Sequence, residues 1–315
     1  MYTIYCVFFE KNMKKAVVKN AASTVLNRMI LTAKKLKLIR RAFFFAKYHN
    51  PWYSIFMPMI TTRAGDFYPL HLLFKNASLL VDEKTEDLPD DQTISKCLEH
   101  LLVKDWFSEP EHAYTALLLE ENAPAPAGYK FIPLRALFDE ERPYSPKAAR
   151  AHALLCWRSR THFCSACGAP LQDDKFETAR SCMMCSEQFF PTIAPAVIVL
   201  IEKEGSVLLA RHSQKNTDVY TCLAGYVEHG ESAEEAVARE VKEEVGITIQ
   251  NIRYITSQSW PFPDQLMLAY KAEYKEGSFH LQADEIDEVK WFTRDNLPSI
   301  PKPGSVAHKL IMGLI

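Results

Sequence analysis

The stretch that most constrains this chain runs from Gly225 to Ile247 and has the sequence GYVEHGESAEEAVAREVKEEVGI. It combines widely spaced glycine and glutamate residues with a dense group of arginine and glutamates. The positions of the pattern are Gly225, Glu231, Arg239, Glu240, Val241, Glu243, Glu244, Gly246 and Ile247. At ordinary residue frequencies, this combination is too specific to arise by chance in one chain of this size.

Local signals predict a helix over the second half of this stretch. Ser232 and Glu235 have the spacing of a capping box, so the helix should begin near Ala233. Gly246 stands where a left-handed C-terminal cap would end it. An apolar stripe then repeats every four residues, at Ala233, Val237, Val241 and Val245.

Three carboxylates converge on this predicted helix. At ~100° per residue, Glu244 lies ~40° from Glu240, and Glu243 lies ~60° from Glu240. Glu244 falls inside the apolar stripe, where a carboxylate is costly unless a cation or a donor meets it. Hard cations such as Mg²⁺ prefer oxygen ligands and commonly bridge to phosphates. The pattern therefore predicts metal-assisted attack of water on a phosphoanhydride, with Glu240, Glu243 and Glu244 as catalytic residues.

A glutamate-rich helix face that is merely solvated is the alternative interpretation. The complete pattern argues against it, because such a face needs no fixed arginine or glycines. We predict that Arg239 is an ion-pair partner that orients a glutamate.

Four cysteines form a second pattern, with a 14-residue gap between Cys164-x₂-Cys167 and Cys182-x₂-Cys185. Paired knuckles at this separation are typical of a zinc ribbon. Four thiolates saturate a tetrahedral Zn²⁺, so we predict one structural zinc per chain. A redox role and nucleic-acid binding by the ribbon are the alternatives.

Composition excludes few function classes. The other four of the eight cysteines are scattered, which favours a reducing compartment such as the cytoplasm. The net charge of −2 gives no overall signal for nucleic acid or membrane binding. No apolar run reaches ~18 residues, so no membrane span is predicted.

Residues 1–56 differ from the rest, because the segment 11–47 is basic and contains no Asp or Glu. It fits an organellar presequence, a basic helix that touches a membrane or RNA, or an ordinary structured helix. Alternatively, the true start lies downstream, at Met57 or Met59.

The remaining chain divides by pattern. Short apolar runs (LHLLF, SLLVD, YTALLLEE, YKFIPLRALF) predict strands, while residues 93–107 and 145–160 predict helices. We therefore expect a basic extension (1–56), an α+β domain (57–160), the ribbon (161–192) and a catalytic domain (193–315). In the last of these, a hairpin, the glutamate helix, three further strands and a final helix predict a mixed sheet between helices.

A further motif, SQSWPFP at residues 257–263, follows the glutamate helix. Together with the ribbon and the glutamate pattern, it resembles the NADH pyrophosphatase subfamily of the Nudix hydrolases over about residues 146–315. That subfamily carries the array SQPWPFPxS. Here Ser259 replaces its first proline and Gln265 its final serine.

The resemblance implies a fold and a set of site residues. It implies a Nudix α/β/α sandwich, preceded by the four-cysteine ribbon and a smaller N-terminal α+β domain, α+β overall, in a homodimer. It places Mg²⁺ or Mn²⁺ on Glu240, Glu243, Glu244 and a later acidic ligand, Glu285. The expected substrate contacts are Phe190, Tyr226, Gln258, Trp260 across a dimer interface, and the backbone of Ala307.

We therefore expect hydrolysis of the pyrophosphate of NADH, and of NAD⁺, to reduced nicotinamide mononucleotide and AMP. One alternative is removal of NAD caps from RNA 5′ ends by the same site. Others are a broader dinucleotide or ADP-ribose pyrophosphatase, and a zinc-ribbon protein that binds nucleic acid.

Overall fold

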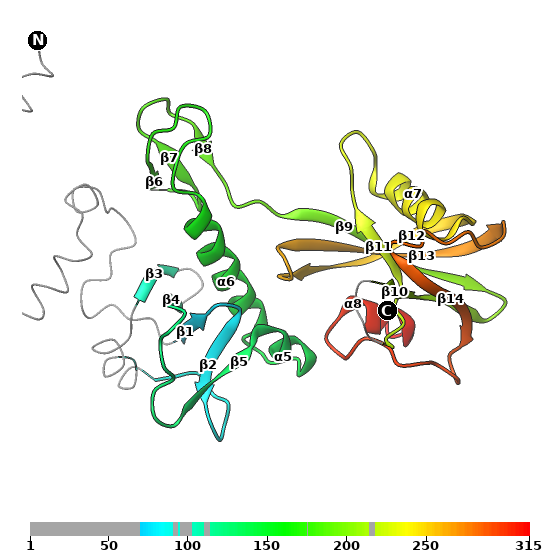
Figure 1. Ribbon diagram of the computed structural model, residues 1–315, viewed down its shortest axis with the longest axis horizontal. Helices are drawn as coiled ribbons and strands as arrows, with labels where there is room; N and C mark the ends of the chain where they lie inside the picture. The colour runs from blue at the N-terminus through cyan, green and yellow to red at the C-terminus, as the bar shows by residue number, and fades with distance from the viewer. Residues whose placement is uncertain (1–69, 91–93, 95–102, 110–113, 175, 214–217) are drawn as a thin grey trace, which may run out of the picture. The chain divides into compact units, whose positions relative to one another are not determined.

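The computed structural model describes residues 70–315 except 91–93, 95–102, 110–113, 175 and 214–217 (Figure 1). The predictions for residues 1–56 lie outside the described residues. The first sheet has the strand order β3-β4-β1-β2-β5. Its strands are Leu70–Lys75 (β1), Ser78–Asp82 (β2), Val103–Glu109 (β3), Tyr114–Leu119 (β4) and Tyr129–Pro133 (β5).

Strand β4 is buried on both faces. Tyr114 and Leu118 on one face pack in a cluster with two helices, α5 (Leu134–Asp139) and α6 (Ser145–Arg160). Leu117 on the other face packs with Ile94 and with neighbouring strands. Burial on both faces explains why the sequence of β4 is a continuous apolar run rather than an alternating one.

The predicted helix over residues 93–107 is wrong for its last part. Residues from Val103 onward form β3, which pairs antiparallel with β4. Trp106 packs on one face of the sheet and Phe107 on the other. Large apolar residues on both faces of a strand produce a run that periodicity alone cannot distinguish from a buried helix.

The cysteine-containing segment forms a small sheet of three antiparallel strands, β6 (Leu171–Asp173), β7 (Arg180–Cys182) and β8 (Gln188–Phe189). Arg158, at the end of α6, contacts it. The guanidinium lies 2.9 Å from a carboxylate oxygen of Asp105 in β3 and 2.9 Å from one of Asp173 in β6. Because this side chain is buried, its positive charge needs both carboxylates as ion-pair partners.

The C-terminal part is built on a six-stranded sheet with the order β12-β13-β9-β10-β14, in which β11 also pairs with β9. The strands are Ala194–Lys203 (β9), Ser206–His212 (β10), Leu223–Tyr226 (β11), Thr248–Trp260 (β12), Gln265–Glu276 (β13) and Ile286–Thr293 (β14). Most neighbours are antiparallel, whereas β13 runs parallel to β9. The mixed sheet predicted from the sequence is therefore confirmed.

Strand β9 separates two cores. Val197, Val199 and Ile201 pack with the apolar stripe of helix α7 (Ala233–Val245). The alternate residues Ile198 and Leu200 belong to the core that contains α8 (Val306–Ile311). Successive side chains of a strand point to opposite faces, so one apolar strand serves both layers. Figure 1 shows α7 and α8 on opposite sides of this sheet, as in the expected sandwich.

Helix α7 has the predicted ends. The Ser232 side chain accepts a hydrogen bond from the backbone N–H of Glu235, and the Glu235 carboxylate accepts from the Ser232 backbone. Gly246 closes the helix with φ of 79°. These local caps fix where the helix begins and ends, and hence which face carries the glutamates.

The described helices are short, and α6, the longest, has 16 residues. Within this part of the chain, no helix is both long and apolar enough to cross a bilayer.

Candidate active site

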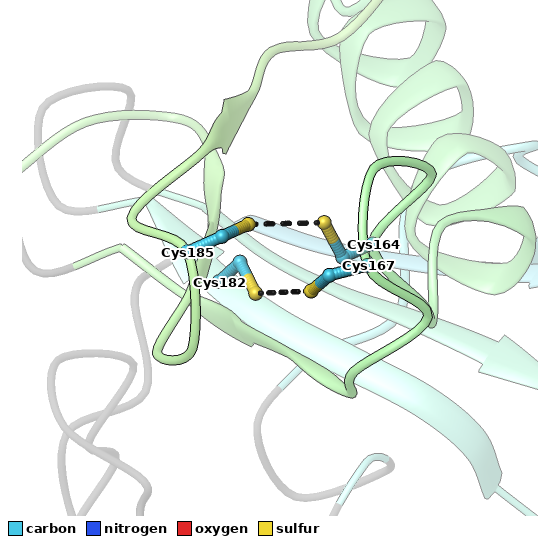
Figure 2. Close-up of side chains that lie close together, drawn as sticks. All are labelled: Cys164, Cys167, Cys182 and Cys185. Carbon is cyan, nitrogen blue, oxygen red and sulfur yellow. Dashed lines mark hydrogen bonds between the residues drawn. The ribbon is translucent and has the colours of Figure 1, made fainter.

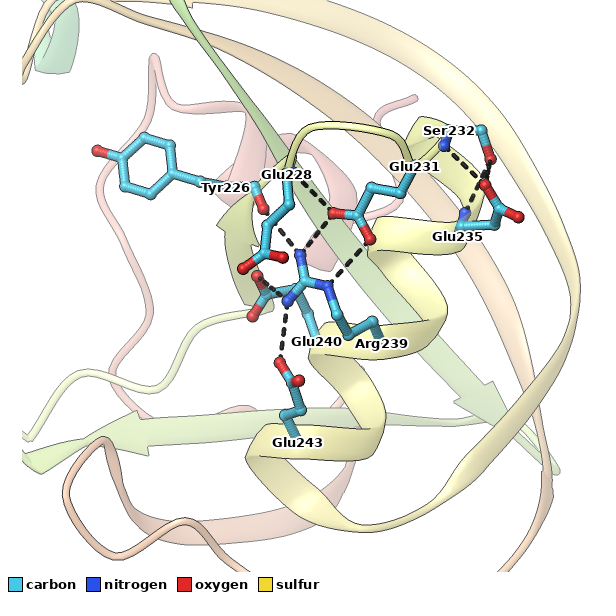
Figure 3. A network of polar contacts seen from close by, with 8 residues as sticks. All are labelled: Tyr226, Glu228, Glu231, Ser232, Glu235, Arg239, Glu240 and Glu243. Carbon is cyan, nitrogen blue, oxygen red and sulfur yellow. Dashed lines mark hydrogen bonds and ion pairs between the residues drawn. The ribbon is translucent and has the colours of Figure 1, made fainter.

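Arg239 joins three carboxylates on and beside α7 (Figure 3). Its Nη1 donates to Oε1 of Glu240 and to Oε2 of Glu243, each at 2.9 Å. Its Nε and Nη2 hold both oxygens of Glu231, at 3.0 and 2.7 Å. Nη2 also donates to the carbonyl oxygen of Tyr226 at 3.0 Å. The predicted role of Arg239 as an ion-pair partner matches this geometry.

The charged side chains of this group shift one another's pKa values. Hydrogen bonds from Arg239 lower the pKa of the Glu231 carboxyl to about 2, and the pKa of Arg239 is raised chiefly by Glu231. Glu240 behaves differently, because burial raises its pKa. The charges of Glu243 and Glu285 raise it further, against the opposing effect of Arg239. Carboxylates are thus crowded around Glu240, a situation that a bound cation relieves.

Gly225 allows the Glu240 carboxyl to lie against strand β11. A Cβ placed on Gly225 would lie 2.0 Å from the carboxyl carbon of Glu240 and 2.3 Å from Oε2. Gly225 is not among the glycines with positive φ, so its conformation alone does not demand glycine. The close approach of Glu240 explains this position of the sequence pattern.

Two further predicted ligands lie at this side of α7. Glu244 is only 2 % exposed and belongs to the buried face of the helix, as its place in the apolar stripe predicts. Glu285 precedes β14; its Oε1 accepts a hydrogen bond from the Gln282 side chain at 3.2 Å. Its influence on the pKa of Glu240 places its charge near the same group.

The oxygen-rich donor set suits a hard cation such as Mg²⁺ or Mn²⁺. The ligand atoms do not converge as tightly as in a closed metal cage. In the described part of the chain, only the four cysteines gather ligand atoms within 4.8 Å of one another. Arg239 instead engages one oxygen each of Glu240 and Glu243 in hydrogen bonds to the same Nη1.

The four cysteines form the second cluster (Figure 2). The Sγ atoms of Cys164 and Cys185 are 3.5 Å apart, as are those of Cys167 and Cys182. Thiolates at Zn–S distances of about 2.3 Å around a tetrahedral ion would be about 3.8 Å apart. The cluster therefore fits a four-coordinate metal site, as the spacing predicts.

The predicted substrate residues are spread over several elements. Tyr226 ends β11 and Phe190 follows β8, and the two residues are 48 % and 54 % exposed. Ala307 is buried in α8. Trp260 packs edge-on against Phe138 of α5, with ring centroids 5.6 Å apart.

The Gln258 amide is engaged within the chain. It donates to the carbonyl oxygen of Gly304 and accepts from the backbone N–H of Val306, both at 2.7 Å. In this structure Gln258 therefore holds the segment that leads into α8 and carries Ala307. These partners could not be predicted, because they lie 46 and 48 residues away along the chain.

Comparison with known proteins identifies the family. The NUDIX domain matches residues 191–312. The chain is 45% identical over 178 residues to the NAD-capped RNA hydrolase NudC of Salmonella heidelberg (strain SL476), covering 56% of this chain and 69% of that protein. The NudC of Salmonella typhimurium (strain LT2) matches with the same identity and coverage.

The chain belongs to the Nudix hydrolases. Its relatives place it in the predicted NADH pyrophosphatase subfamily, as an enzyme that hydrolyses pyrophosphate bonds. A solved structure, the NUDIX hydrolase from Nitrosomonas europaea, is 24% identical with a TM-score of 0.41, covering 48% of this chain and 88% of that one.

The close approach of Glu240 to Gly225 can be tested in this Nudix hydrolase with the variant Gly225→Ala. In Gly225→Ala, the new methyl group displaces the Glu240 carboxyl, which can swing away at the end of its flexible side chain. The free energy of unfolding should stay within about 1 kcal/mol of wild type. Pyrophosphate hydrolysis should fall about 10-fold or more, since small misplacements of catalytic groups are costly. Thermal unfolding and kcat/KM test this, and a folded variant with wild-type turnover would contradict it.

Proposed function

We propose that this Nudix hydrolase splits the pyrophosphate of NADH, and of NAD⁺, into the mononucleotide of nicotinamide and AMP. The observation that carries the proposal is the carboxylate group ordered by Arg239 next to Tyr226, the residue expected to stack on a ring of the substrate. Membership of the NADH pyrophosphatase subfamily supports the same substrate class.

Glu240, Glu243, Glu244 and Glu285 are the proposed residues for Mg²⁺ or Mn²⁺. When bound, the metal would neutralise phosphate charge and lower the pKa of a water molecule. Arg239 holds Glu240 and Glu243 in position and balances part of their charge before substrate arrives. Glu244 is the proposed essential ligand or acceptor of the proton from the attacking water.

We propose that the rings of the substrate bind on the side of β11 to which the Tyr226 ring points, away from the carboxylate group (Figure 3). Tyr226 offers an open ring face for the nicotinamide or adenine ring, and Phe190 and the Ala307 backbone are expected nearby. Gln258 supports this region by fixing residues 304–306. A homodimer, with Trp260 at the interface, and a cytoplasmic location remain predictions.

Removal of NAD caps from RNA is the second candidate function. The relatives at 45% identity carry the name NAD-capped RNA hydrolase. Both substrates contain the same dinucleotide bond, so the same carboxylates would serve either. They differ in whether the adenosine is free or continues into an RNA chain.

A product analysis tests the proposed function. Purified protein with Mg²⁺ or Mn²⁺ is given NADH, NAD⁺, ADP-ribose and an NAD-capped RNA in parallel, and the products are separated by chromatography. We expect AMP and reduced nicotinamide mononucleotide to form fastest from NADH. Glu244→Gln should keep the fold and lose about 10²–10⁴ in rate.

Faster cleavage of capped RNA would support the second candidate over free NADH. Faster cleavage of ADP-ribose would contradict the nicotinamide substrate. A Glu244→Gln variant with near wild-type turnover would contradict the role given to Glu244.

We also propose that the metal of the cysteine cluster is a single structural Zn²⁺. Elemental analysis should find about one zinc per chain in the wild type and a large loss in Cys182→Ser, together with a lower melting temperature. Cys156→Ser is the matched control, because Cys156 lies outside the cluster, and it should keep its zinc. Full zinc content in Cys182→Ser would contradict the assignment.

A further inference from the structure

Tyr226 is held by contacts at its backbone and at its hydroxyl group. At the backbone, Tyr226 pairs with Ala196 of β9, and its carbonyl oxygen accepts from Arg239. At the far end, the phenol oxygen accepts a hydrogen bond of 2.6 Å from Nε2 of Gln265. Figure 3 shows the ring pointing away from the carboxylate group while its carbonyl points toward it.

Gln265 is itself placed by the sheet. It is the first residue of β13, where its backbone is in register with Ala194 of β9 on one side and Trp260 of β12 on the other. The side chain thus starts from an ordered backbone position. A serine, which the subfamily motif has here, ends two bonds earlier along the side chain and would not span to the Tyr226 hydroxyl.

We propose that Gln265 is a positioning residue that sets affinity for the aromatic base of the dinucleotide by holding the Tyr226 ring. This inference deepens the proposed function and rests on it. An exposed aromatic side chain must lose its freedom of rotation when it stacks on a ligand, and that ordering costs affinity. The hydrogen bond from Gln265 removes part of this cost before binding, while leaving the ring face open to a planar heterocycle.

A double-mutant cycle on binding tests the proposal. The affinity for NADH is measured by its fluorescence, without added Mg²⁺ or Mn²⁺ so that turnover does not interfere, for wild type, Gln265→Ala, Tyr226→Phe and the double variant. Each single change should weaken binding about 3- to 10-fold, the amount expected for one hydrogen bond. The double variant should be no weaker than either single one.

Two controls separate positioning from general damage. Gln250→Ala removes an exposed glutamine from β12 and should leave NADH affinity unchanged. Tyr226→Phe keeps the ring and loses only the hydroxyl, so its fold should be intact. With metal added, KM should rise in Gln265→Ala while kcat stays within about twofold, because the carboxylate group is untouched.

Unchanged NADH affinity in Gln265→Ala, or losses that add up in the double variant, would overturn the proposal. Failure of the proposed function is seen separately, in wild-type turnover. If the wild type cleaves ADP-ribose and does not bind NADH, the proposed function fails. The binding of ADP-ribose is then compared in the same four proteins. A double variant no weaker than either single one would support the role given to Gln265, and additive losses of affinity would contradict it.

Discussion

The ion pairs of Arg239 are the interaction on which this site depends. One planar guanidinium meets both oxygens of Glu231 and one oxygen each of Glu240 and Glu243. A bidentate contact of this kind fixes direction as well as distance. It gathers one carboxylate that precedes α7 and two that lie on the helix, and its positive charge offsets part of their mutual repulsion. Burial, together with the charges of Glu243 and Glu285, still raises the pKa of Glu240, and a bound cation would relieve that unfavourable charge.

The layers of the fold keep this group in place. Strand β9 supplies one face to α7 and the other to α8, so both helices are fixed to a common strand. Strand β11 lies beside β9 and brings Gly225 against Glu240 and Tyr226 next to it. The carboxylate group and the proposed base-binding ring are therefore set by consecutive residues of a single strand.

Features that depend on neighbouring residues could be predicted from the sequence. The ends of α7 follow from Ser232, Glu235 and Gly246, and the cysteine cluster follows from its spacing. Contacts between distant residues could not be predicted. The clash that keeps position 225 a glycine, the hold of Gln258 on residues 304–306 and the bond from Gln265 to Tyr226 all need the folded sheet. Strand β3 could not be predicted, because Trp106 and Phe107 are adjacent in the sequence but pack on opposite faces of the sheet.

We propose that the carboxylates ordered by Arg239 hold the catalytic metal. Binding of Mn²⁺, followed by electron paramagnetic resonance, tests it most directly and needs no substrate. We expect one Mn²⁺ site in the wild type, with its affinity weakened at least about 10-fold in Glu240→Gln and Glu244→Gln. Glu276→Gln, an exposed residue of β13, should bind like wild type. Equal Mn²⁺ affinity in all four proteins would contradict the assignment of the metal to these carboxylates.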